Sequence, residues 1–150
     1  MSVEKDFNEI LDYAHFWNWA PDWQVVKEIY QIKPESYSVL TPFAYTYLEE
    51  MIRSTTSEYG IPPFNEKGEP NIIAVGLKLI NLAIDENVKN TEYTILLEKT
   101  KSYYKYINNT SDENGRNQVL HGHTHPRFWP KEDFENLIHH IAELSKHSRF

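Results

Sequence analysis

Cysteine is absent from this chain of 150 residues. Its absence excludes a disulfide framework, thiolate zinc sites, iron–sulfur clusters and a cysteine nucleophile. Long hydrophobic runs are missing too, because no uninterrupted stretch approaches the roughly 20 apolar residues that a membrane span needs. We therefore expect a soluble protein with no membrane partner.

Basic residues are in the minority, with 15 Lys and Arg against 22 Asp and Glu and a formal charge of −7. This balance excludes a uniformly basic nucleic-acid coat and leaves only regional basic patches as candidate anion sites. Residues 1–10 carry Glu4, Asp6 and Glu9 where a secretion signal would need basic residues and then an apolar run. Cytoplasmic localisation is the resulting expectation.

Length and composition predict a single domain over residues 1–150. With 40% hydrophobic residues, a chain of this size is able to bury roughly 68–70% of its unfolded surface around one core.

Apolar residues recur with helical spacing along most of the chain. The pattern predicts a first helix from Phe7 to about Trp17, ended by Pro21, and a second around Trp23 to Tyr30, closed by Pro34. It then predicts a helix with Thr41 as N-cap and Pro42 as its first residue. Further helices are expected at 72–84, apolar nearly all round and therefore central and buried, at 93–107, around 116–121, and at 134–144.

Strand alternation is not apparent, and residues 61–70 are rich in breakers and polar residues, which predicts an exposed connection. The fold class expected is all-α, a bundle of about five to seven helices. On the last helix, the spacing places His140 on the polar face and His147 in the final turn, where solvation and the helix dipole account for them.

The segment from Arg116 to Lys131 concentrates chemically versatile side chains. It holds the cations Arg116, Arg127 and Lys131, three histidines and no acid. The rest of the chain therefore has 12 basic and 22 acidic residues, which gives it a formal charge of −10. At a Debye length of about 8 Å, most of that remote acidic charge is screened from an anion bound here. Local charge can therefore outweigh net charge, and the segment is the candidate phosphate site.

Within this segment, the run from Arg116 through Asn117 to His121 and Gly122 resembles the signature of HEPN domains, which is an arginine, then usually a polar residue, and a histidine after four to six intervening positions. The helical order from Thr41 to Leu144 is compatible with that family over about two thirds of the chain. The N-terminal forty residues match nothing in it and form a helical extension.

The resemblance implies a HEPN-like helical bundle that dimerises so that motif residues from two chains line one cleft. It further implies metal-independent endoribonuclease chemistry without a cofactor, with Arg116, His121 and Asn117 as catalytic residues. A histidine can move protons at the ribose 2′-hydroxyl and the leaving 5′-oxygen, and an arginine can hold the phosphate. The family's bacterial members also suggest phage defence or a toxin–antitoxin system, with a cognate antitoxin or regulatory protein as partner.

RNA binding would draw on further residues of the same segment. The histidines and cations beside the motif offer phosphate contacts, and Trp129, with Phe128 between two prolines, offers a stacking surface. The residues predicted to bind RNA are His123, His125, Arg127, Trp129 and Lys131.

Two alternatives remain open at the level of sequence. The first is a non-catalytic HEPN-like dimerisation or interaction module, which the net charge of −7 favours because a ribonuclease must attract a polyanion. The second is metal binding by His121, His123 and His125. The stretch Gly122 to Pro126 is similar to the terminal histidine motif of calcineurin-like phosphoesterases, but the earlier motifs of those enzymes are missing, so no metal site is assigned.

Overall fold

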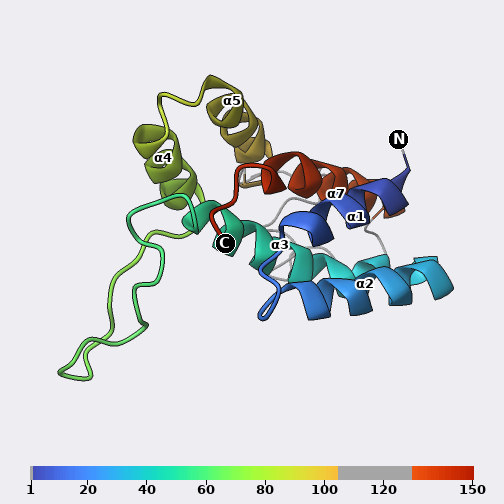
Figure 1. Ribbon diagram of the computed structural model, residues 1–150, viewed down its shortest axis with the longest axis horizontal. Helices are drawn as coiled ribbons and strands as arrows, with labels where there is room; N and C mark the ends of the chain where they lie inside the picture. Colours follow the sequence, from blue (N-terminus) through green and yellow to red (C-terminus); the bar gives the residue numbers. More distant parts are fainter. Residues whose placement is uncertain (1, 105–129) are drawn as a thin grey trace, which may run out of the picture.

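A computed structural model describes residues 2–104 and 130–150. Over these residues the chain is helical and contains no strand, which confirms the all-α prediction (Figure 1). The α-helices described are α1 (Val3–Tyr13), α2 (Ala20–Ile32), α3 (Tyr37–Arg53), α4 (Leu77–Glu86), α5 (Thr91–Thr100) and α7 (Lys131–Ser145). Two short 3₁₀ helices, η1 (Pro34–Ser36) and η2 (Lys101–Tyr104), precede α3 and follow α5. No described helix has the length and apolarity to cross a membrane.

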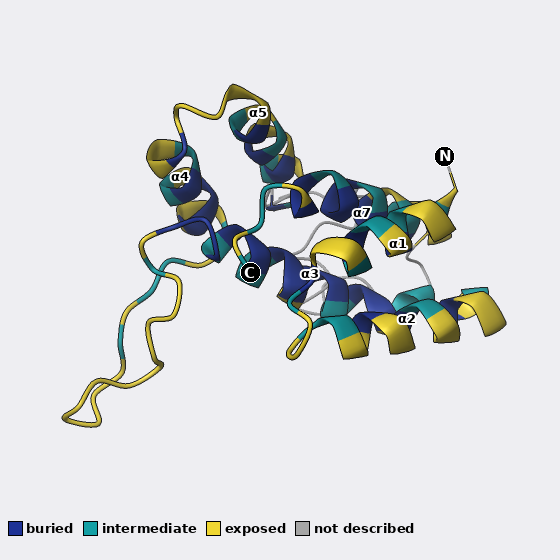
Figure 2. Ribbon diagram, viewed as in Figure 1, coloured by how far each residue is buried: buried dark blue, intermediate teal, exposed yellow. Residues whose placement is uncertain are grey.

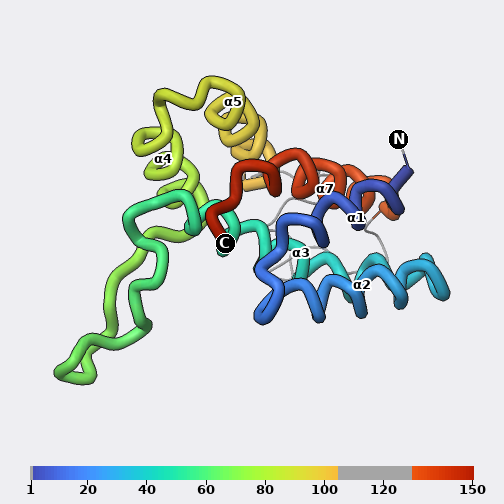
Figure 3. The backbone as a smooth tube through the Cα atoms, viewed as in Figure 1, coloured from blue at the N-terminus to red at the C-terminus, as the bar shows by residue number. Residues whose placement is uncertain are grey.

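Helices α3 and α7 form the middle of the bundle, and the other helices pack around them. Helix α1 packs on α7 and on α2, while α4 and α5 form a pair beside the C-terminal part of α3 (Figures 1 and 3). The buried faces of these helices point inward in Figure 2 and share one hydrophobic core. The N-terminal forty residues are part of that core, since Phe7, Ile10 and Trp23 are buried in it.

The core between α1, α2 and α3 is aromatic. Trp23 and Tyr47 are fully buried, and their rings meet nearly at right angles, 83°, with centroids 5.1 Å apart. The ring of Phe7 lies 6.2 Å from that of Trp23. Edge-to-face pairs of this kind add about 0.5–1.5 kcal/mol each beyond the burial of their area. Phe7 of α1 and Trp23 of α2 are therefore core residues.

Helix α3 begins earlier than the sequence pattern predicts. Thr41 is not its N-cap, because the helix starts at Tyr37 and contains Pro42. The proline lacks the N–H that would bond to the carbonyl of Ser38. The Thr41 hydroxyl nevertheless donates to the Tyr37 carbonyl at 2.7 Å, and Leu40 is buried in the core. Tertiary burial of this first turn outweighs the missing backbone hydrogen bond.

The predicted helix at 72–84 is wrong in its first half. Helix α4 begins only at Leu77, after Gly76, whose φ of +58° lies in the left-handed region that favours glycine. Ile72 is 97% exposed, so this stretch is neither helical nor central. The first helix was also predicted too long, because α1 ends at Tyr13 and Trp17 is 74% exposed.

Other boundaries changed less. Pro21 stands in the first turn of α2 instead of ending the helix before it. The helix predicted from residue 93 corresponds to α5, which ends at Thr100 and is followed by the 3₁₀ helix η2. Helix α7 contains the whole of the predicted last helix.

An arm made of residues 57–76 projects away from the bundle between α3 and α4 (Figures 1 and 3). Near its tip the two legs pair through an antiparallel bridge between Phe64 and Pro70, and the amide of Asn71 donates to the Pro63 carbonyl at 2.9 Å. The Asn65 side chain accepts from the amides of Lys67 and Glu69, which closes the turn. This confirms the exposed connection predicted at 61–70.

Shortening the arm is expected to leave the bundle intact. Replacing residues 64–70 with Asn-Gly joins Pro63 to Asn71 through a two-residue turn, because these residues are already hydrogen-bonded. No residue of 64–70 belongs to the core, so unfolding stability should stay within about 0.5 kcal/mol of wild type. Urea unfolding of both proteins measures this, and a loss of several kcal/mol would show that the arm supports the fold.

Candidate functional site

Most of the site predicted from the sequence lies outside the described residues. This applies to the catalytic candidates Arg116, Asn117 and His121 and to the RNA-binding candidates His123, His125, Arg127 and Trp129. The same holds for the metal-binding alternative at 121, 123 and 125. Their predicted roles therefore remain predictions.

Lys131 is the described member of the predicted RNA-binding set. It is the first residue of α7, and its Nζ lies 3.5 Å from Glu135 Oε1 and 5.9 Å from the centroid of the Tyr30 ring. The Tyr30 hydroxyl donates to the same carboxylate at 2.5 Å. Lys131 thus already pairs with a carboxylate, which weakens it as a phosphate ligand, although half of its side chain is exposed.

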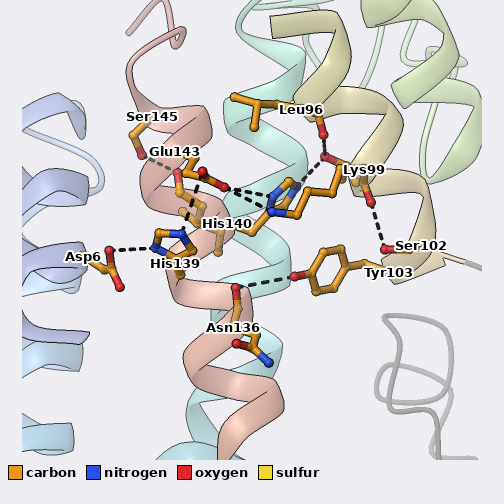
Figure 4. A network of polar contacts seen from close by, with 12 residues as sticks. Asp6, Leu96, Lys99, Ser102, Tyr103, Asn136, His139, His140, Glu143 and Ser145 are labelled. Atoms are coloured by element: carbon orange, nitrogen blue, oxygen red, sulfur yellow. Dashed lines mark hydrogen bonds and ion pairs between the residues drawn. The ribbon is translucent and has the colours of Figure 1, made fainter. Parts of the chain in front are cut away.

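A polar network connects α1, α5, η2 and α7 next to the point where the described chain breaks off after Tyr104 (Figure 4). Its centre is His140, which is fully buried. Helix spacing puts this residue three positions after Leu137 and four before Leu144, both core residues. The prediction of a polar-face His140 is therefore wrong, and that spacing was the signal that identifies it as buried.

The hydrogen bonds of His140 define its tautomer. Its Nε2 lies 2.7 Å from Thr100 Oγ1, and that hydroxyl lies 2.8 Å from the Leu96 carbonyl, to which it donates. A hydroxyl has a single hydrogen to give. The Thr100 oxygen must therefore accept from His140 Nε2–H, so Nδ1 is unprotonated. Among the described residues, Nδ1 has no hydrogen-bond partner.

Burial keeps this imidazole neutral. Desolvation, together with the nearby Lys99 ammonium, lowers the pKa of His140 to about 4 against the opposing effect of the Glu143 carboxylate. The ring of Tyr103 stacks on the imidazole with centroids 5.1 Å apart. Burial, followed by the negative charges of Asp133 and Glu143, raises the pKa of Tyr103 to about 12.

Glu143 links the two neighbouring histidines to Lys99. Its Oε1 is 3.8 Å from His139 Nε2, and its Oε2 is 3.9 Å from His140 Nδ1 and 3.4 Å from Lys99 Nζ. On the far side, His139 Nδ1 lies 3.0 Å from Asp6 Oδ1, which ties α1 to α7. The charges in the network are thus paired within the protein.

These contacts make the network a structural one. His140 is sealed from solvent, and the carboxylates of Asp6 and Glu143 are engaged by cationic or imidazole groups. Among the described residues, no group of three or more histidines and carboxylates is arranged to hold a metal ion. A small pocket of about 170 Å³ between α5 and α7 reaches Glu143 but neither histidine. Sequence reasoning missed this network because its members come from distant helices.

The described parts that flank residues 105–129 are well anchored. On one side, the ring of Tyr104 is buried and meets that of Tyr45 edge to face at 6.4 Å. On the other, Phe134 in the first turn of α7 is buried against Tyr30 at 5.2 Å. The described residues on both sides of 105–129 are therefore packed into the core.

Comparison with known proteins gives no match. No protein-family model, no curated protein and no solved structure is significantly similar to this chain.

Proposed function

We propose that this protein is a metal-independent endoribonuclease of the HEPN type that acts as a homodimer. The observation that carries the proposal is the motif Arg116, Asn117 and His121 in a chain whose described part is built from α-helices and contains no strand.

The residue types suit cleavage of RNA by its own ribose. His121 takes the proton from the ribose 2′-hydroxyl as the 2′-oxygen attacks the phosphorus. The P–O5′ bond then breaks, and the leaving 5′-oxygen receives a proton. Arg116 holds the phosphate through its guanidinium fork and offsets the charge that develops there. The products are a 2′,3′-cyclic phosphate and a free 5′-hydroxyl.

Helix geometry favours a site shared by two chains. If residues 116–121 form an uninterrupted helix, as the sequence pattern predicts, five positions correspond to roughly 140° of rotation, so Arg116 and His121 of one chain would not face each other. A two-fold axis would bring the arginine of one chain beside the histidine of the other. Light scattering at micromolar concentration tests this arrangement, and a monomer there would contradict the shared site.

A non-catalytic HEPN-like interaction module is the second candidate. The charge of −7 favours it, because the acidic surface repels RNA. Cytoplasmic phage defence or a toxin–antitoxin pair, with a regulatory protein as partner, would fit either candidate.

Incubation of purified protein with mixed RNA in EDTA separates the two candidates. The ribonuclease is expected to cut RNA without metal and to leave cyclic phosphate ends, whereas a binding module leaves the RNA intact. Zinc titration of the melting temperature, against a chelated control, tests the metal-binding alternative at His121, His123 and His125. An upward shift with zinc would favour that alternative.

A further inference from the structure

The outer face of α2 carries an apolar stripe that the described residues leave uncovered. Val25, Ile29 and Ile32 are 52%, 41% and 85% exposed. At 100° per residue they fall within a sector of about 60° on the helix. This spacing of four and three residues is the pattern by which one helix docks on another. The opposite face of α2, with Trp23, Val26 and Tyr30, already packs in the core.

Charged residues stand at the two ends of this stripe. Asp22, in the first turn of α2, and Lys33, at its C-cap, both lie on the same flank, about 60° and 80° from Val25. Both are exposed, and neither has an ion-pair partner among the described residues. An acid at one end and a base at the other make the stripe self-complementary for an antiparallel neighbour.

We propose that the α2 stripe is the interface with a second copy of this chain, with the two α2 helices antiparallel across a two-fold axis. With the axis perpendicular to the plane of the two helices, the flank that bears Asp22 meets the flank that bears the partner's Lys33. Each dimer then contains this ion pair twice. Val25 packs near the partner's Ile32, and Ile29 lies near the axis.

Charge explains why a copy of the same chain fits this surface. The protein is at −7, so two copies repel each other over most of their surface. The stripe itself is uncharged, and its flank offers both signs. On the opposite flank, Glu28 accepts a hydrogen bond from its own Gln24 Nε2 at 2.8 Å, which holds that carboxylate against its own helix.

The dimer should be weak and concentration-dependent. A helix of 13 residues is about 20 Å long, and pairing two such helices buries less than the roughly 1,200 Å² of a stable interface. Phe16 and Trp17, in the turn between α1 and α2, are also exposed, at 79% and 74%. We expect dissociation constants in the micromolar range.

This inference assigns the surface of the dimer on which the proposed function relies, and in that sense it rests on the proposed function. The α2 interface and the ribonuclease activity can be contradicted separately. Association is measured by light scattering, which needs no ribonuclease activity, and cleavage is measured with RNA.

The first test replaces Ile29 with glutamate and follows mass against concentration by light scattering. Ile29→Glu is expected to weaken dimerisation by about 10-fold or more, because a charge would be placed beside its own copy at the axis. The matched control is Ile95→Glu, an isoleucine of α5 that is 64% exposed and outside the stripe. The control should dimerise as wild type does. A monomeric wild type, or dissociation by Ile95→Glu and not by Ile29→Glu, would overturn the proposal.

The second test exchanges the two charges. Asp22→Lys and Lys33→Asp should each weaken the dimer by roughly 3–10-fold, because each sets like charges against each other twice. The double variant restores the pair with inverted signs and should dimerise as wild type does. Circular dichroism melts show that each variant is folded. Additive weakening in the double variant would contradict the antiparallel arrangement.

Discussion

Replacing His121 with alanine is expected to lower RNA cleavage by roughly 10²–10⁴-fold, the range for loss of a proton-transfer group. Arg116→Ala should be comparably severe, because in the proposed mechanism the arginine holds the phosphate and offsets the charge of the transition state. Initial rates of cleavage of one labelled RNA, measured in EDTA for each variant, give both numbers.

Stability separates a catalytic role of the two residues from a structural one. A catalytic pair in an open cleft has few packing partners, so either substitution should stay within about 0.5 kcal/mol of wild type in a thermal melt, or stabilise slightly by removing facing cations. A buried, saturated pair would leave a polar partner unsatisfied and cost about 1–3 kcal/mol. If both variants are destabilised and the wild-type protein does not cut RNA, the proposed ribonuclease activity is refuted.

The chain offers a matched control for the histidine. His139 lies on α7, pairs with Asp6 at 3.0 Å and belongs to the structural network. His139→Ala removes an imidazole from the same protein without touching the motif, so cleavage should change little. A loss of cleavage as large as that of His121→Ala would indicate that the catalytic histidine lies on α7.

The largest stability effect is expected from the pH dependence of His140. In the unfolded chain its pKa is near the ordinary 6.5, and in the native state burial lowers it to about 4. Between these values the unfolded state binds more protons, so stability rises with pH and is lost as the pH falls from 6.5 towards 4. The lowered pKa corresponds to a loss of about 3 kcal/mol across this window.

His140→Gln removes this titration and keeps an amide donor close to Thr100. Urea unfolding of wild type and variant, repeated across the window, should give stability profiles that diverge by about 3 kcal/mol, with wild type losing more on acidification. Lys99→Gln should reduce the acid loss of wild type, since the ammonium helps to lower the pKa of His140. Parallel profiles for wild type and His140→Gln would contradict a buried neutral imidazole.

The helical class and several helices could be predicted from the sequence because their apolar spacing is local. Trp23, Val26 and Tyr30 in α2, and Phe134, Leu137 and Ile141 in α7, repeat at three and four residues and are buried as the pattern requires. Such patterns fail where the surrounding tertiary structure determines whether an apolar residue is buried. Ile72 looks like a core residue, yet it stands on the arm, 97% exposed, because the chain turns into α4 only at Gly76.

The candidate motif, by contrast, is identified from the sequence alone. Arg116, Asn117 and His121 are recognisable by residue type and spacing, which suffices to name a chemistry and the experiments that test it. Their neighbours in space are not encoded in a short local pattern, so their catalytic role is still a prediction.

Tertiary structure decided the hydrogen-bond partners and the protonation state of His140, and it decided which face of α2 stays exposed. By composition His140 is one polar residue among others, but the packing of α5 and η2 over α7 seals it beside Thr100 and makes it neutral. In α2 the apolar residues extend over about half of the helix surface, and only the packing of Trp23 into the core leaves Val25, Ile29 and Ile32 outside. Helical periodicity depends on neighbours along the chain, whereas burial and pKa depend on helices that are distant in sequence.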